Sequence, residues 1–347
     1  LFEGGTTGAA EGYFLMTGSV AATLLHLAPG FGNAFANAHN AAKAGSGVLN
    51  IVGDHADYHL VHDSPLKGNV AGVVGAVSHW MRIGTDGASI AADGAAGLRA
   101  ARSSGGRIAS LILPANTAWQ KAHGPADTQP TPPRHRPEQA RIDAAAKALA
   151  APGAALMVGR DALFGAGAEI AGRIAAATGC GLFCDYFVPR LDHGEGAVDI
   201  QRLAYRLEDN QPILAEVRDL ILVGARPPVA FFAYPGKPST PEPPGCRIEP
   251  LCRDTADVLA TLKALETALG AAGETARRRA RALPDRPSGR LTPEAAAAVV
   301  ARQIPEGAIL VDESITVGGA LAPLISGARR HDLLNTMGGA IGGGLPC

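Results

Sequence analysis

Short apolar runs alternate with alanine-rich segments of helical length along the 347-residue chain. In the first part, the runs that predict strands are 20–27, 48–52 and 108–113, and the segments that predict helices are 32–44 and 88–102. In the second part, the expected strands are 155–158, 181–186 and 220–223, and the expected helix is 162–178. Apolar strands that alternate with helices are typical of parallel sheets with crossover helices. We therefore expect an α/β fold of three-layer, parallel-sheet domains.

Two segments interrupt this alternation and indicate linkers. Residues 125–137 contain five prolines, which cannot continue a helix or a central strand. The arginine-rich segment 276–290 also contains prolines and separates a third unit from the second. In that third unit, Thr292 is expected to cap a helix that Pro293 begins, ahead of a strand at 309–311. The expected domains are 1–124, 138–275 and 291–347.

Composition and charge limit which partners the protein can have and where in the cell it is expected. With 31 basic and 32 acidic residues, the chain has no general field that would draw it to nucleic acid or to an anionic membrane. No apolar run approaches the roughly 20 residues of a membrane span. Five cysteines without CxxC spacing argue against a disulfide framework or a zinc site, so a reducing, cytoplasmic location is expected. Because the chain starts at Leu1 and stops at Cys347 in a glycine-rich turn, both ends are expected to be cut.

Two polar constellations stand near the start of the chain. Glu3 lies at an expected helix entrance, ahead of the small residues 4–12, which would let another surface approach closely. A first-turn glutamate stabilised by the helix dipole accounts for the same residues. His26 and Asn33 flank a Pro/Gly-rich turn between a strand and a helix, at the sheet edge where open α/β folds bind ligands. The turn is not a dinucleotide fingerprint, because Phe35 stands where GxGxxG needs glycine. A lone histidine at a strand end is otherwise more often structural.

A third constellation lies near the end of the chain. The polar segment 312–316 follows an expected strand, and the glycine-rich segment 338–346 comes shortly after it. Glycines at this density let backbone N–H and C=O groups reach a ligand. The same run would also make a tight packing turn.

Taken together, the three constellations resemble the thiamine-diphosphate-dependent enzymes related to acetolactate synthase, benzoylformate decarboxylase and pyruvate decarboxylase. The resemblance covers essentially the whole chain and implies a pyrimidine-binding domain, a Rossmann-like central domain and the start of a diphosphate-binding domain. In this family a glutamate precedes an Ala-(Asp/Glu)-Gly-Tyr motif, which matches Glu3 ahead of residues 10–13. Residues Pro29 to Asn33 resemble the family's Gly-Pro-Gly-x-x-Asn turn. His26 stands where benzoylformate decarboxylase-like members carry an active-site histidine.

The resemblance also assigns roles near the end of the chain. Glu313, Ser314 and Thr316 would meet the cofactor diphosphate, Gly339 would orient the pyrimidine amino group, and Ile341 would be the wedge between the two rings. The family's Gly-Asp-Gly motif and its downstream Asn, which hold Mg²⁺, would lie beyond Cys347. Metal binding is therefore implied only for the complete protein, and no metal ligand is assigned in this chain.

The implied reaction is decarboxylation of a 2-oxo acid, followed either by carboligation or by release of an aldehyde. Residues 50–56 and 231–237 resemble the subgroup labelled acetolactate synthase large subunit, which implies branched-chain amino acid biosynthesis; no chemistry is assigned to 231–237. FAD in the central domain stays open, and a homodimer or homotetramer is implied. A non-oxidative decarboxylase and a non-catalytic nucleotide- or flavin-binding relative are the alternatives. An NAD-dependent dehydrogenase would lack its fingerprint.

Overall fold

The computed structural model describes residues 2–315 and 318–347, which form two compact units. Unit 1 contains the chain up to Arg134 together with Thr336–Cys347, and unit 2 contains His135–Asn335. Residues 121–138 have no helix or strand. None of the helices within the described ranges combines the length and the apolar composition that crossing a bilayer requires.

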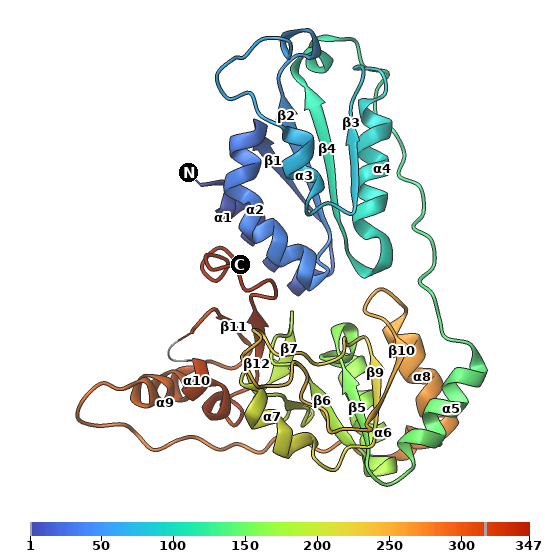
Figure 1. Ribbon diagram of the computed structural model, residues 1–347, viewed down its shortest axis with the longest axis vertical. Coiled ribbons are helices and arrows are strands. Elements are labelled where there is room, and N and C mark those ends of the chain that lie inside the picture. The colour runs from blue at the N-terminus through green and yellow to red at the C-terminus, as the bar shows by residue number, and fades with distance from the viewer. Residues whose placement is uncertain (1, 316–317) are drawn as a thin grey trace. The chain divides into compact units, whose positions relative to one another are not determined.

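Unit 1 is built on one sheet of four parallel strands in the order β1-β2-β4-β3. The strands are β1 (Ala21–His26), β2 (Val48–Asp54), β3 (Trp80–Ile83) and β4 (Ile108–Pro114). The helices are α1 (Glu3–Thr17), α2 (Leu27–Ala44), α3 (Val70–Gly75) and α4 (Ile90–Arg102). Short 3-10 helices are η1 (Asp57–His59), η2 (Ser103–Gly105) and η3 (Ala115–Trp119). Figure 1 shows α1 and α2 lying side by side, with α4 next to β3 and β4.

Alternate residues of β2 explain why helices cover both faces of this sheet. Val48 and Val52 point to one face, where they pack with residues of α1, α2 and α3. Leu49 and Ile51 point to the other face and pack with residues of α4. A strand that is apolar on both faces is typical of a parallel sheet buried between helices. The predicted three-layer α/β architecture is therefore confirmed for this unit.

The start of α2 differs from the expected turn. The predicted helix began at residue 32, whereas α2 begins at Leu27, and Pro29 and Gly30 lie in its first turn. Proline is tolerated there because the first helical N–H groups have no partner within the helix. Leu27 has a φ of 59°, so the chain turns from strand to helix within a single left-handed residue.

Unit 2 contains two sheets. The first is a five-stranded parallel sheet in the order β10-β9-β5-β6-β8, and the second has the order β11-β12-β7, in which β7 runs antiparallel to β12. The strands are β5 (Ala154–Val158), β6 (Gly181–Cys184), β7 (Leu191–His193), β8 (Gln201–Arg202), β9 (Asp219–Val223), β10 (Arg247–Cys252), β11 (Ala308–Asp312) and β12 (His331–Asn335). The helices are α5 (Gln139–Leu149), α6 (Gly165–Thr178), α7 (Leu207–Leu214), α8 (Val258–Leu269), α9 (Pro293–Gln303) and α10 (Gly318–Ile325), with 3-10 helices η4 (Arg160–Ala162) and η5 (Ala271–Gly273).

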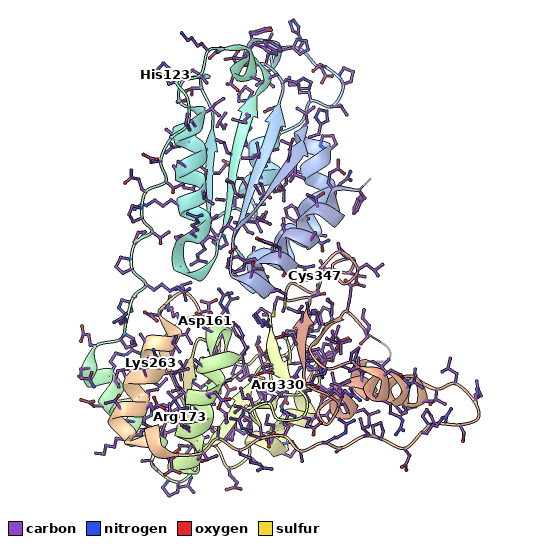
Figure 2. All side chains as sticks on the ribbon, turned by 180° about the vertical axis from the view of Figure 1, so that it is seen from behind. His123, Asp161, Arg173, Lys263, Arg330 and Cys347 are labelled. Carbon is purple, nitrogen blue, oxygen red and sulfur yellow. The ribbon has the colours of Figure 1, made fainter. Side chains whose placement is uncertain are left out.

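One apolar core joins most of unit 2. Side chains of α5, α6 and α8 pack in the same cluster as side chains of α9, α10 and β12. Ion pairs reinforce the packing: Arg173 of α6 pairs with Glu266 of α8, and Arg330 pairs with Asp192 of β7. Figure 2 labels the two arginines. The Thr292 side chain accepts a hydrogen bond from the Ala295 N–H, which confirms the predicted cap of α9. The three-domain division at 125–137 and 276–290 stays a prediction.

Candidate active site

Glu3 and the start of α2 lie together in unit 1. Glu3 is in the first turn of α1, and its Oε2 accepts a hydrogen bond of 3.0 Å from the Asn33 side-chain amide. This bond is the largest cause that lowers the pKa of Glu3 below its usual value. A Cβ added to Gly30 would lie 3.4 Å from Glu3 Oε1 and 3.4 Å from His26 Cβ. The structure therefore brings Glu3, His26 and Asn33 to one end of α2, as expected for a site.

His26 is the last residue of β1 and the N-cap residue of α2. Its side chain is exposed, and so is Pro29 in the first turn of the helix. Since β1 pairs in parallel with β2, His26 lies at the carboxyl edge of the sheet, opposite Gly53. This is the edge at which open α/β sheets bind ligands. An exposed imidazole at this edge is free to meet a small molecule.

Three asparagines run along one face of α2 and organise the site. Asn33, Asn37 and Asn40 are spaced four and three residues apart, which places them on the same side of the helix. Asn37 is buried, and its amide donates to the Gly4 carbonyl at 2.8 Å and to the Gly342 carbonyl at 3.1 Å. One side chain therefore connects the beginning of α1 with the glycine-rich segment 338–344.

Asn40 holds the same segment with one hydrogen bond that its side chain donates and one that it accepts. Its amide donates to the Ala340 carbonyl at 2.8 Å, and its Oδ1 accepts from the Ala340 N–H at 3.1 Å. The amide also donates to Asn37 Oδ1 at 3.1 Å, so the two asparagines hold each other. Asn40 is fully buried, which leaves no water to replace these bonds.

The glycine-rich segment takes a conformation that needs glycine. Gly339 has a φ of 70° and Gly342 a φ of 108°, both in the region that other residues rarely adopt. Between them, Ile341 is 69% exposed and belongs to no core cluster of the described chain. An isoleucine held out of the core between two glycines is available to contact a ligand.

The small residues of α1 pack closely against the last residues of the chain. A Cβ at Gly8 would meet Pro346 at 2.6 Å, and one at Gly12 would meet the backbone of Cys347, which is labelled in Figure 2, at 2.3 Å. The sequence prediction that these residues allow a close approach is confirmed. Glu11, next to Gly12, is almost completely buried, and its Oε1 has no hydrogen-bond partner among the described residues. Burial raises the pKa of Glu11 to about 8.

The predicted diphosphate segment belongs to unit 2. Ser314 follows β11, and both its N–H and its hydroxyl donate to Oδ1 of the buried Asp312. Glu313 is partly exposed beside it. Thr316 lies outside the described residues. Across residues 2–315 and 318–347, no group of three or more His, Cys, Asp or Glu side chains is arranged to hold a metal ion.

The sequence motifs did not include Asn37 or Asn40, and Asp312 stood in the polar segment 312–316 without a role of its own. A signal for the asparagines was present: three amides at i, i+4 and i+7 on an alanine-rich helix are costly to bury without partners. Asn37 and Asn40, however, each donate to a backbone carbonyl about 300 residues away along the chain, and no local pattern indicates those partners.

The first 71 residues match the family described as "Thiamine pyrophosphate enzyme, N-terminal TPP binding domain". The chain is therefore similar to the thiamine-diphosphate-dependent enzymes. Over its whole length it is 43% identical to a protein of Mycobacterium tuberculosis (strain ATCC 25618 / H37Rv) named "Putative acetolactate synthase large subunit IlvX". The chain spans 66% of that relative's length, slightly less than two thirds.

Solved structures share the fold over the whole chain. A structure titled "X-ray structure of a putative thiamin diphosphate-dependent enzyme isolated from Mycobacterium smegmatis" has a TM-score of 0.81 at 21% identity, and 70% of it is covered. The 4-hydroxybenzoylformate decarboxylase of Rhodococcus jostii RHA1 has a TM-score of 0.78 at 17% identity with 69% covered. Benzoylformate decarboxylase from Polynucleobacter necessarius has a TM-score of 0.78 at 18% identity with 68% covered. At these identities the likeness concerns the fold.

Proposed function

We propose that the complete protein uses thiamine diphosphate to decarboxylate a 2-oxo acid and then transfers the remaining acyl unit to a second carbonyl compound. The observation that carries this proposal is the Glu3 carboxylate, held by Asn33 beside His26 at the start of α2. The name of the 43% identical relative supports the synthase outcome. Neither the family's description nor the names of these relatives mention flavin, so FAD is not part of the proposal.

The residues present fit the cofactor that the family uses. Glu3 is an accessible carboxylate whose pKa is lowered by Asn33, so it is ionised at neutral pH and can accept a hydrogen bond from a ring nitrogen. Gly30 leaves room beside Glu3 Oε1, and Ile341 offers an exposed apolar side chain. When bound, the cofactor supplies the carbon nucleophile and the electron sink that loss of carbon dioxide requires.

The roles of the remaining residues follow from their contacts. Asn33 holds one oxygen of Glu3 and leaves the other for a proton or a ring nitrogen. In the proposal, Asn37 and Asn40 fix the segment that carries Gly339 and Ile341, so that a carbonyl and an apolar wedge are positioned in advance. Glu313, Ser314 and Thr316 are proposed to meet the diphosphate, and Pro29 shapes the turn beside Glu3.

The proposal extends to the surroundings of the site. Mg²⁺ is proposed to bind to residues beyond Cys347 in the complete protein. The assembly is proposed to be a homodimer or homotetramer, as the resemblance implies. A cytoplasmic location is supported by the five cysteines, all of which are free thiols.

The test is turnover of pyruvate and other 2-oxo acids by the full-length protein with thiamine diphosphate and Mg²⁺, for wild type and Glu3→Gln. Glutamine keeps a hydrogen-bonding group but cannot take up or release the proton, so turnover should fall at least about 100-fold. The matched control is Glu294→Gln in the first turn of α9, a glutamate whose pKa is also lowered by local hydrogen bonds. This control should keep wild-type turnover.

Wild-type-like turnover by Glu3→Gln would make Glu3 a structural helix-entry residue. Absence of turnover in the wild-type protein on every 2-oxo acid, with no binding of thiamine diphosphate, would instead favour the non-catalytic relative.

A second candidate is a decarboxylase that releases an aldehyde, and the exposed His26 favours it. An imidazole can give up a proton near neutral pH, and protonation at the reacting carbon would end the reaction as an aldehyde. The measurement is the product ratio from pyruvate and from an aromatic 2-oxo acid. If His26 is the donor, His26→Ala should lose aldehyde release more than decarboxylation, and the share of carboligated product should rise. An unchanged ratio would return His26 to a structural role.

A further inference from the structure

Strand β7 joins two parts of unit 2. Along the chain it lies between β6 and β8 of the five-stranded sheet, yet it pairs antiparallel with β12 and completes the sheet β11-β12-β7 (Figure 1). The β7–β12 strand pair therefore links the expected central domain to the expected third domain. In its register, three pairs of identical residues lie opposite each other: Leu191 and Leu333, Asp192 and Asp332, and His193 and His331.

The two faces of this strand pair differ. Successive side chains of a strand point to opposite faces, so the leucines and the histidines share one face and the aspartates lie on the other. Leu191 and Leu333 belong to the apolar core of unit 2. His193 and His331 are almost as deeply buried, at 3% and 2% exposure. On the other face, each aspartate forms an ion pair with an arginine that precedes the opposite strand.

Neither imidazole has all of its hydrogen-bonding groups paired. His331 Nδ1 lies 2.7 Å from the Arg329 carbonyl oxygen, and because a carbonyl can only accept, this nitrogen carries the proton. In the neutral ring, Nε2 is then a bare acceptor, and it is buried without a hydrogen-bond partner among the described residues. His193 Nδ1 is likewise buried and has no partner there. The two ring centroids are 5.3 Å apart, in an edge-to-face arrangement.

The groups around His193 oppose a positive charge on its ring. Burial is the largest cause that brings the pKa of His193 well below its usual value, and the charges of Arg279, His331 and Arg202 act in the same direction. Asp199 lies 3.6 Å from Arg279, but its carboxylate also pairs with a second arginine. His193 therefore faces two guanidinium groups across a buried polar cluster.

The groups around His331 are mixed in sign. Burial is the largest cause that lowers the pKa of His331, and the Arg329 carbonyl acts against it. Three carboxylates also act against it: Asp332, Asp192 and Glu306. The net shift is downward, so His331 is mostly neutral at pH 7.

We propose that the His193–His331 pair makes the β7–β12 strand pair acid-sensitive: the strands stay together while both rings are neutral, and they separate when protons bind to the pair. A proton on His331 Nε2 would create a buried charge whose N–H has no acceptor. A proton on His193 would add a third cation beside two arginines. Water solvates both imidazolium rings once the strands have separated, so the open state binds protons that the closed state excludes.

Separation would also affect the segment after β11. The Asn335 side chain, at the end of β12, accepts a hydrogen bond from the Val188 N–H at 3.5 Å and donates to the Asp312 carbonyl at 3.4 Å. Asp312 in turn accepts two hydrogen bonds from Ser314. Acid would therefore loosen residues 312–315, which precede α10 in the same unit. The inference goes beyond the proposed function and is tested without substrate or cofactor.

Hydrogen exchange of the full-length protein at pH 7.5, 6.5, 5.5 and 5.0, followed by mass spectrometry, measures the separation. Results are expressed as protection factors, which remove the direct effect of pH on chemical exchange. Protection of peptides that cover 188–194 and 329–335 should fall at least about tenfold from pH 6.5 to pH 5.0, because each proton taken up on opening shifts the equilibrium by up to about tenfold per pH unit. Unchanged protection in these peptides would overturn the proposal.

The double variant His193→Leu/His331→Leu removes both titrating groups and extends the leucine pairing that is already present at 191 and 333. Replacing both buried polar partners by apolar groups of similar size is close to neutral or stabilising. Protection at pH 7.5 should therefore equal or exceed that of wild type, and the fall in acid should be absent. A fall as large as that of wild type would assign the effect to other groups, against the proposal.

The matched control is His135→Leu, which removes an exposed histidine of the same unit. It should lose protection in acid as wild type does, and loss of the acid effect in this control would also count against the pair. Asp185 cannot cause the fall. Burial raises its pKa, and a carboxyl group that binds its proton more tightly in the folded state makes the folded state more stable in acid.

NMR of the wild-type protein keeps the proposal testable if the double variant does not fold. Ring nitrogen signals of ¹⁵N-histidine-labelled protein distinguish neutral from protonated imidazoles. Both His193 and His331 should be neutral at pH 7, and their protonation at lower pH should accompany the loss of protection in β7 and β12. A ring that is protonated at pH 7, or that gains its proton while protection is unchanged, would overturn the proposal.

Discussion

At the scale of single residues, Glu3 and Glu11 lie on the same helix, but the pKa of one is lowered and the pKa of the other is raised. The carboxylate of Glu3 is accessible and bonded to Asn33, and its pKa is lowered. Glu11 is buried, and its pKa is raised to about 8. Two turns of α1 therefore separate a glutamate that is charged at pH 7 from one that is largely protonated. Environment, rather than residue type, decides which of them can serve as a carboxylate.

Glu11→Gln should change how stability depends on pH. The folded protein keeps the Glu11 proton up to about pH 8, whereas the unfolded chain loses it near the ordinary value of 4.5. Between these values the folded state binds more protons, so this group's contribution to the free energy of unfolding falls as pH rises, by up to about 1.4 kcal/mol per pH unit. The variant should therefore gain stability relative to wild type between pH 5 and pH 8.5, by a few kcal/mol.

The measurement is denaturant unfolding of both proteins at pH 5, 7 and 8.5. The difference between the two removes the contribution of every other titrating group. A difference that stays constant over this range would mean that Glu11 is ionised in the folded protein.

At the scale of elements, one face of α2 holds the asparagines of the candidate site, and its other face packs against the sheet. Its apolar residues Phe31, Ala34 and Ala38 are in the core, while Asn37 and Asn40 hold the glycine-rich segment. Loss of either amide would leave buried backbone groups without partners, which costs roughly 1–3 kcal/mol for each group.

Asn40→Ala should loosen residues 338–343 while leaving the sheet of unit 1 intact. The Ala340 N–H and C=O would lose both of their hydrogen bonds to the Asn40 side chain, so local opening becomes easier. Hydrogen exchange followed by mass spectrometry should show faster exchange in peptides that cover 336–347, by about tenfold or more. The control is Asn69→Ala, which removes an asparagine that only caps α3 through the Gly72 N–H. Equal exchange in Asn40→Ala and wild type would show that the segment is held by other contacts.

At the scale of the whole molecule, the chain alone should bind thiamine diphosphate weakly or not at all, whereas the full-length protein should bind it with Mg²⁺. The proposed metal ligands lie beyond Cys347, and without the metal the diphosphate charge is uncompensated. Calorimetric titration of residues 1–347 and of the full-length protein, with and without Mg²⁺, measures this. Tight, Mg²⁺-dependent binding by residues 1–347 would show that metal ligands are present within this chain.

The sequence predicted the parts of the fold in which one local signal dominates. Strands β2 and β4 are mostly apolar, and both were expected at nearly their observed bounds. Strand β3, Trp80–Ile83, was missed because it is short, contains Arg82 and lies at the edge of the sheet. The antiparallel pairing of β7 with β12 was missed because it joins segments about 140 residues apart, which no local pattern encodes.

The residues of the candidate site also fall into two groups, those that the sequence indicated and those that it did not. The spacing of Glu3, His26 and Asn33 was visible in the sequence, and the structure brings these residues together. The contacts of Asn37 and Asn40 with the glycine-rich segment were not visible, because Gly342 and Ala340 lie at the far end of the chain. The roles proposed for Glu313, Ser314, Gly339 and Ile341 stay predictions.

The two asparagine contacts also have a consequence for synthesis on the ribosome. Asn37 and Asn40 emerge about 300 residues before Ala340 and Gly342. At about 5–20 residues per second, the nascent α2 waits for roughly 15–60 s before these backbone groups exist. During that interval unit 1 has its sheet but lacks its last segment, and the exposed amides of α2 and the small-residue face of α1 are open to other contacts. Chaperone engagement should therefore peak on nascent chains that end between Arg134 and Thr336.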